Sequence, residues 1–332
     1  MRNLNQINGI EIALYDMAKK DLKLQEYFFS YYNQKLRLFN HFYSHIQEKL
    51  IGFNDHGPDH INRILEIYPR ILENRIPNID GKTDLFKKSL NFYEVYLLLS
   101  ATIWHDVANL MGRDNHGINI KQMPVFNESV FVNDELKKYI LQIAESHTGE
   151  GSIEKKINRE TEYAYNHTLN LRFLAAILRL ADELEETERR IDWNYYISNG
   201  YIEEEQKIYW EINHCIKSIN PEPESEVIKI NCRIDKNKCL DIFKKNNNSV
   251  ALIDELIYRI NKMNYERQYT QKYLYSKYLL FKCIEFDLIV SGESISYKFI
   301  FDDDHGYEDF WERYNQLNPE KQIKNYKLIG CK

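Results

Sequence analysis

The chain has 332 residues, of which 43% are hydrophobic and 28% are charged, and its formal net charge is −6. These values are ordinary for a globular protein and argue against a disordered chain. The sequence has no run of about 18 apolar residues and no apolar signal segment at its N-terminus, so we expect a cytoplasmic protein that does not bind membranes. Because Lys and Arg are scattered among acidic residues, we also expect no binding to duplex DNA.

Residues 1–192 show helical periodicity almost throughout, with few Gly or Pro. The pattern predicts helices at about residues 9–24, 25–50, 58–68, 84–111, 133–147 and 168–188. We therefore expect this part to be a helical bundle domain.

The pattern changes in residues 193–332, where alternation of apolar and polar residues predicts strands. EVIKINCRI (residues 226–234) is one such segment, and IEFDLIV and ISYKFIF flank SGES as a predicted hairpin. SVALIDELIYRINKMN and the tyrosine-rich segment that follows it are predicted to be helical, with a loop at KKNNN before them. The expected fold class is mainly α: a helical bundle followed by a smaller α+β part with an antiparallel sheet.

Four predicted helices carry a His or Asp on the same stripe as their apolar residues. Such residues face a core or a cleft, because residues three and four apart lie on one face of a helix. They are His60, His105 with Asp106 beside it, His147 and Asp182.

Two interpretations of these inward groups are open. One is a core of ion pairs, for which Arg63 and Arg179 are the available cations. The other, which we favour, is a divalent metal ion, because two carboxylates would neutralise the ion and mixed nitrogen and oxygen ligands suit such ions.

The words HGPDHINRIL, LLLSATIWHDVANLMG, IAESHTGEG and LRLADELEE cover residues 51–191. In this order and spacing the chain resembles the HD-domain metal-dependent phosphohydrolase superfamily, and is most similar to a bacterial subgroup of conflict-type, defence-associated systems. The resemblance implies that His60, His105, Asp106 and Asp182 bind one or two divalent ions, with Mn, Fe, Mg, Ni and Zn all open.

The resemblance also implies roles for residues near these ligands. Asp106 or Asp182 would orient the attacking water, while His116 and His147 would bind a second ion, contact phosphate or act as an acid. Arg113 suits a phosphate clamp, because a guanidinium binds oxyanions with two hydrogen bonds; for Arg113 and His116 a solvated loop is an equal alternative.

Two further details limit the prediction. HDVANL replaces the HDIGK or HDIGH of many superfamily members, so the cyclic-dinucleotide phosphodiesterase branch is less supported. His56 precedes the helix that begins near Pro58, where it would line the mouth of a cleft, and a helix-capping role for Asp55 or His56 is at least as well supported.

The leading functional hypothesis is hydrolysis of a phosphoester of a nucleotide or another small phosphorylated substrate. One alternative is a phosphodiesterase or nuclease acting on cyclic nucleotides or single-stranded nucleic acid, and another is a regulatory HD module that binds a partner protein. The tyrosines of residues 265–280 are expected to pack within the monomer, although an interface for a homo-oligomer stays open.

Overall fold

The computed structural model describes residues 9–49, 54–73, 89–112, 116–148, 152–198, 201–291 and 295–317. The chain divides into two compact units. The first unit comprises Met1–Ile51, Asp55–Glu185 and Thr270–Leu280, and the second comprises Gly52–Asn54, Glu186–Tyr269 and Phe281–Lys332. The main change of unit, at Glu185–Glu186, lies a few residues before the boundary predicted after residue 192.

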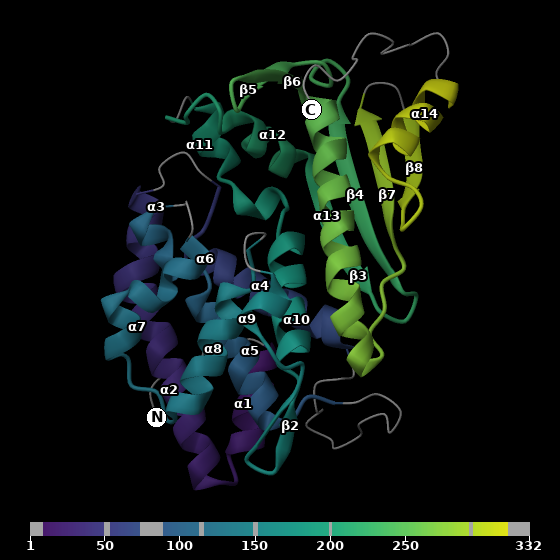
Figure 1. Ribbon diagram of the computed structural model, residues 1–332. Helices are drawn as coiled ribbons and strands as arrows, with labels where there is room; N and C mark the ends of the chain where they lie inside the picture. Colours follow the sequence, from purple (N-terminus) through teal and green to yellow (C-terminus); the bar gives the residue numbers. More distant parts are fainter. Residues whose placement is uncertain are drawn as a thin grey trace. The chain divides into compact units, whose positions relative to one another are not determined.

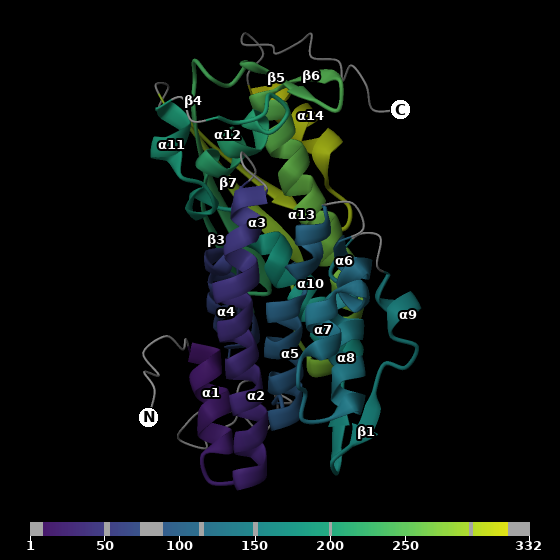
Figure 2. The ribbon, with the colours of Figure 1, turned by 90° about the vertical axis from the view of Figure 1, so that its left-hand side faces the viewer.

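The first unit is a helical bundle (Figures 1 and 2). Its longer helices are α1 (Gly9–Ala18), α2 (Leu22–Leu38), α4 (Pro58–Leu72), α5 (Phe92–Trp104), α8 (Asp134–Glu145) and α10 (Leu171–Leu184). A π-helical turn, Phe39–Tyr43, joins α2 to α3 (Ser44–Lys49). The short elements are 3-10 turns at Val107–Met111 and Ile120–Gln122 and the helices α6 (His116–Asn119), α7 (Pro124–Glu128) and α9 (Ile153–Lys156).

Helix α5 lies at the centre of this bundle. It contacts α1, α2, α4, α8 and α10, and every residue from Phe92 to Trp104 except Tyr93 is buried. This position explains why the segment is apolar on all sides. The helix begins at a capping box formed by Asn91 and Glu94.

Three predicted helix boundaries are wrong. The break between the first two helices lies at Asp21, not at residue 24, because the Asp21 carboxylate accepts hydrogen bonds from the N–H groups of Lys23 and Leu24 and caps α2. Helix α5 ends at Trp104, not at residue 111, and the ring of His105 bonds to the Thr102 carbonyl that would continue the helix. The start predicted at residue 84 lies outside the described residues.

The third wrong boundary reveals a hairpin in the part predicted to be wholly helical. Strands β1 (Glu162–Ala164) and β2 (His167–Leu169) pair antiparallel, so α10 begins at Leu171 and not at residue 168. Tyr165 and Asn166 have φ values of 56° and 61°. Two successive left-handed residues form the tight turn that suits a two-residue hairpin.

The second unit is built on a four-stranded sheet in the order β3-β4-β7-β8 (Figure 1). The strands are β3 (Ile216–Glu222), β4 (Val227–Asp235), β7 (Cys283–Ser291) and β8 (Ile295–Phe301). The predicted antiparallel hairpin is confirmed as β7–β8, and β3–β4 is also antiparallel. The central pair, β4–β7, is parallel. Parallel strands need a long crossover connection, and the chain between β4 and β7 provides one that includes a helix.

The helices of the second unit are α11 (Trp193–Ile197), α12 (Lys207–Cys215), most of α13 (Leu252–Leu274) and α14 (Tyr307–Leu317), with a 3-10 turn at Glu188–Arg190. The end of α13, from Thr270, and the 3-10 turn Tyr275–Lys277 belong to the first unit. The loop predicted at KKNNN is instead a hairpin of β5 (Ile242–Lys245) and β6 (Asn248–Ala251). Its turn residues, Asn246 and Asn247, have φ values of 48° and 63°. No described helix is both long and apolar enough to cross a membrane.

Candidate metal centre

Four elements of the first unit bring the predicted ligands together. His60 lies in the first turn of α4, His105 and Asp106 follow α5, His147 follows α8, and Asp182 lies in the last turn of α10. The side chains of His60 and His105 are fully buried, and that of Asp182 is 25% exposed. The cluster is therefore buried and most open at Asp182.

The ligand atoms of these residues converge. Nε2 of His60 lies 3.2 Å from Oδ1 of Asp182 and 3.6 Å from Oδ2 of Asp106. Nε2 of His105 lies 3.7 Å from Oδ2 of Asp106 and 3.8 Å from Oδ1 of Asp182. Metal–ligand bonds of about 2.0–2.2 Å place neighbouring ligand atoms roughly 3 to 3.5 Å apart, so the spacing is close to that of a metal shell.

Hydrogen bonds on the far side of each ring determine which nitrogen faces the cluster. Nδ1 of His105 bonds to the carbonyl oxygen of Thr102 at 2.7 Å, and Nδ1 of His147 bonds to that of Ala144 at 2.6 Å. A carbonyl only accepts, so Nδ1 carries the proton and Nε2 presents a lone pair. Nε2 of His105 is buried without a hydrogen bond among the described residues, which fits a metal ligand.

His60 is held in the same way by a carboxylate. Nδ1 of His60 bonds to Oε2 of Glu185 at 2.7 Å, and the other carboxylate oxygen of Glu185 accepts a hydrogen bond from Arg63. Arg63 also pairs with Asp55 at 2.8 Å. Carboxylate–histidine pairs of this kind orient metal-binding imidazoles in many proteins. The sequence pattern did not identify Glu185.

These contacts decide how the buried charges are compensated. Arg63 forms ion pairs with Glu185 and Asp55. Arg179 donates a hydrogen bond to the carbonyl of Thr148 at 2.9 Å. Among the described residues, the side-chain nitrogens nearest the Asp182 carboxylate are Nε2 of His60 and of His105, which form ion pairs with it only when the rings are protonated. Burial opposes the ionisation of Asp182, but these two imidazoles lower the pKa of its carboxyl well below the usual range. The contacts of Asp182 thus fit a metal site better than an arginine-paired core.

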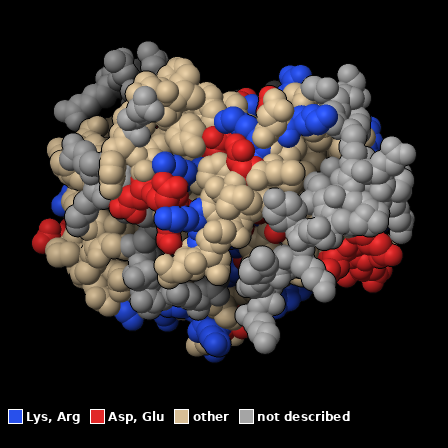
Figure 3. All heavy atoms as spheres, turned by 90° about the horizontal axis from the view of Figure 1, so that it is seen from above, with Lys and Arg blue, Asp and Glu red and all other residues tan. Residues whose placement is uncertain are grey.

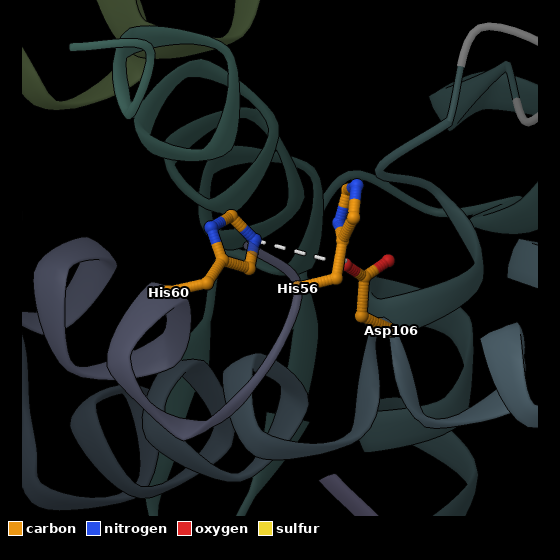
Figure 4. Close-up of side chains that lie close together, drawn as sticks. All are labelled: His56, His60 and Asp106. Carbon is orange, nitrogen blue, oxygen red and sulfur yellow. Dashed lines mark hydrogen bonds and ion pairs between the residues drawn. The ribbon is translucent and has the colours of Figure 1, made fainter. Parts of the chain in front are cut away.

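His56 lies within the cluster and not only at the mouth of a cleft, as the sequence suggested (Figure 4). It is 6% exposed, and its Nδ1 lies 3.1 Å from Oδ2 of Asp106. The N-cap of α4 is Gly57, without a side-chain capping bond, so the capping alternative for His56 is wrong. Asp55 instead accepts a hydrogen bond from the N–H of Gly57. The sequence feature that could have indicated this position is the pair of histidines in HGPDH, His56 and His60.

Three groups have ligand atoms within 4.8 Å of one another. They are His60, His105 and Asp182; His105, Asp106 and His147; and His56, His60 and Asp106. Asp106 belongs to two of them, with Oδ2 directed to His56 and His60 and Oδ1 lying 3.6 Å from Nε2 of His147. His60, His105 and Asp106 each belong to two of the three groups, so the residues present could hold a divalent ion.

The loop that follows the cluster is only partly described. Arg113 lies outside the described residues, and for His116 the backbone begins α6 while the side chain is not described. A β carbon added at Gly117 would lie 2.7 Å from Cγ2 of Thr148 and 3.4 Å from Cε1 of His147. The backbone next to His116 therefore lies against His147.

Comparison with known proteins gives one match. No curated protein and no solved structure matches the chain. The HD-CE family model matches residues 50–259, a range that includes every residue of the cluster. Since this range is more than half of the sequence, the chain belongs to the HD-CE family of HD-domain proteins.

Proposed function

We propose that the protein is a metal-dependent phosphohydrolase that cleaves a phosphoester of a nucleotide or another small phosphorylated substrate. One observation carries the proposal: the imidazoles of His60, His105 and His147, each held through Nδ1, direct Nε2 toward the carboxylates of Asp106 and Asp182. Membership of an HD-domain family supports the same chemistry.

The ligands in this proposal are His60, His105, Asp106 and Asp182. A divalent ion bound to them would polarise a phosphoryl oxygen and lower the pKa of a water molecule. Substrate and water reach the cluster beside Asp182, because its side chain is the most exposed of the four. The Asp182 carboxylate can accept a proton from that water and orient it.

His147 lies on the other side of Asp106 and is assigned either to a second ion or to the phosphate of the substrate. Its neutral tautomer, with the proton on Nδ1, suits a ligand better than a proton donor at Nε2. Because Arg63 pairs with Glu185 and Asp55, we assign the phosphate clamp to Arg113 and a supporting role to His116. The choice of Arg113 and His116 comes from the sequence prediction.

The surface charge supports a small substrate. On the face drawn in Figure 3, the Lys and Arg side chains of the described residues lie among Asp and Glu side chains and form no single basic area. Binding to duplex nucleic acid depends on many phosphate contacts by basic residues. A nucleotide-sized substrate needs only the metal centre and one or two cations.

Metal analysis is the first test. The wild-type protein and Asp106→Asn are dialysed against Mn²⁺, and bound metal and unfolding temperature are measured. We expect bound Mn²⁺ and metal-dependent stabilisation in the wild type, and a loss of both in Asp106→Asn. The matched control is Asp59→Asn, an exposed residue of α4, which should behave as wild type. No bound metal and no stabilisation in the wild type would overturn the proposal.

A substrate panel with Mn²⁺ is the second test. It contains deoxynucleoside and ribonucleoside triphosphates, cyclic nucleotides, single-stranded DNA and RNA. Hydrolysis of mononucleotides that is lost in Asp106→Asn supports the proposal. Cleavage of cyclic nucleotides or single strands alone would replace it with the phosphodiesterase alternative. Absence of any hydrolysis, with a partner protein co-purifying, would replace it with the regulatory module.

A further inference from the structure

The second unit contains a pocket of about 390 Å³ that is separate from the metal centre of the first unit. One wall is the face of α13 that carries Tyr258, Asn261 and Gln268, and the other is the segment from Asp302 to Asp309, which connects β8 to α14. Its volume lies in the range of small-molecule sites. The family model ends at residue 259, so nearly all of this pocket lies beyond the matched range.

Hydrogen bonds hold the connecting segment in place. Its Asp302 carboxylate accepts the N–H groups of Asp304 and His305 at 2.9 Å and 2.7 Å. The carbonyl of Asp302 accepts from the side-chain amides of Asn264 and Gln268 on α13, both at 2.8 Å. Because the two walls are bonded to each other, a ligand would meet a pocket that is already formed.

The pocket is strongly acidic. Five carboxylates line it, and none of its described lining residues is Lys or Arg. Asp303 pairs with the buried guanidinium of Arg267 at 2.6 Å, and Asp309 accepts the N–H of Gly306 at 2.7 Å. Asp304 and Glu308 are exposed. A concave surface of one charge sign concentrates ligands of the opposite sign, so the pocket favours a cation.

A buried acceptor in the wall gives the cation a specific contact. Asn261 is 3% exposed, and its Oδ1 has no hydrogen bond among the described residues. A β carbon added at Gly306 would lie 2.9 Å from this oxygen, so the main chain of Gly306 lies against the oxygen and a side chain there would clash with it. A buried acceptor without a donor costs about 1–3 kcal/mol, and a ligand N–H would remove that cost.

The remaining lining residues favour an organic cation over a metal ion. The groups of His, Cys, Asp and Glu that could hold a metal all lie in the first unit, as far as the chain is described. Three tyrosines, Tyr258, Tyr265 and Tyr307, line the pocket instead, and the rings of Tyr258 and Tyr307 meet edge to face at 6.4 Å. Aromatic rings attract alkylammonium groups.

We propose that this pocket binds a small alkylammonium ligand of the diamine or polyamine class. One ammonium group donates a hydrogen bond to Oδ1 of Asn261, the exposed carboxylates of Asp304 and Glu308 balance the ligand charge, and the methylene chain lies against the tyrosine rings. This binding site is independent of the proposed phosphohydrolase activity.

The test is isothermal titration of the full chain with putrescine, spermidine and choline. We expect putrescine and spermidine to bind, more weakly as salt concentration rises, and choline to bind at least tenfold more weakly, because its quaternary nitrogen has no N–H for Asn261. Asn261→Ala should weaken putrescine binding about tenfold, which corresponds to 1.4 kcal/mol. Gly306→Ala should weaken it similarly, because the added β carbon would crowd Oδ1 of Asn261.

Two controls make the result decisive. Asp304→Asn combined with Glu308→Gln should reduce affinity, whereas Asp241→Asn, an exposed acid of the same unit outside the pocket, should not. Asn261→Ala removes a buried unsatisfied acceptor, so its unfolding temperature should not fall. No binding of either amine at millimolar concentration, or equal binding by wild type and all variants, would overturn the proposal.

Discussion

At the scale of single residues, the metal centre depends on which nitrogen of each imidazole carries the proton. Backbone carbonyls serve this purpose for His105 and His147, and they cannot be removed by mutation. His60 is different, because a side chain, Glu185, accepts its Nδ1 proton. Mutation of Glu185 can therefore test whether the hydrogen bond that orients His60 affects metal binding.

We predict that Glu185→Gln weakens metal binding about 10- to 100-fold, the range observed for such outer partners. The neutral amide is a poorer hydrogen-bond acceptor for His60, and it no longer balances the positive charge of Arg63. Competition with a chromophoric chelator measures the affinity. The control is Glu11→Gln, a buried glutamate of the same unit that pairs with Lys35; it should lower stability without changing metal affinity. Equal metal affinity in Glu185→Gln and wild type would refute the positioning role.

At the scale of elements, α5 carries two ligands at its C-terminal end and a capping box at its N-terminal end. We predict that Asn91→Ala lowers the free energy of unfolding by about 1 kcal/mol, the usual cost of losing an N-cap. Metal affinity should not change, since a helix of this length spans roughly 20 Å. Urea denaturation and the chelator assay measure the two quantities. A large loss of metal affinity would show that the two ends of α5 are coupled.

The packing of α6 against the residues after α8 gives a second prediction at this scale. Gly117→Ala would place a β carbon 2.7 Å from Thr148 and close to His147. We expect a destabilisation of about 1–3 kcal/mol from overpacking. Gly9→Ala is the matched control, because its β carbon would meet only Pro69 at an ordinary 3.8 Å. Thermal unfolding compares the two variants, and equal stability would contradict the close packing at Gly117.

At the scale of the whole molecule, Glu186 joins distant segments of the second unit. Its carboxylate contacts Arg190 at 3.6 Å and Asn213 at 3.1 Å, and it also pairs with Arg259. Burial opposes ionisation of this carboxyl, but Arg259, Arg190 and Lys262 lower its pKa from 4.5 to about 2. Because the folded pKa is the lower one, this stabilisation is complete above pH 4.5 and is lost as the pH falls toward 2.

We predict that Glu186→Gln lowers the free energy of unfolding at pH 7 by about 3 kcal/mol, as expected when one partner of a buried ion pair is removed. It should also flatten the decline in stability between pH 4.5 and 2. Urea denaturation across this pH range is the measurement. Glu204→Gln, which breaks an exposed pair with Lys207, should have little effect. An unchanged acid profile in Glu186→Gln would contradict this account.

The sequence alone determined the helical bundle, the β7–β8 hairpin and the inward direction of His60, His105, His147 and Asp182. Periodicity suffices for these features because burial of one face imposes it on each element separately. The hairpins β1–β2 and β5–β6 were missed, since their strands have only three or four residues and their turns depend on left-handed Tyr and Asn residues.

Only the tertiary structure decided which groups meet. His56 precedes its helix and Glu185 follows α10, so neither lies on a periodic stripe, yet both contact the cluster. The sequence pattern also did not predict the pairing of Arg63 with Glu185 or the parallel pairing of β4 with β7. These contacts join residues far apart in the chain. Local pattern shows which face of an element is buried, and packing between elements determines its partner.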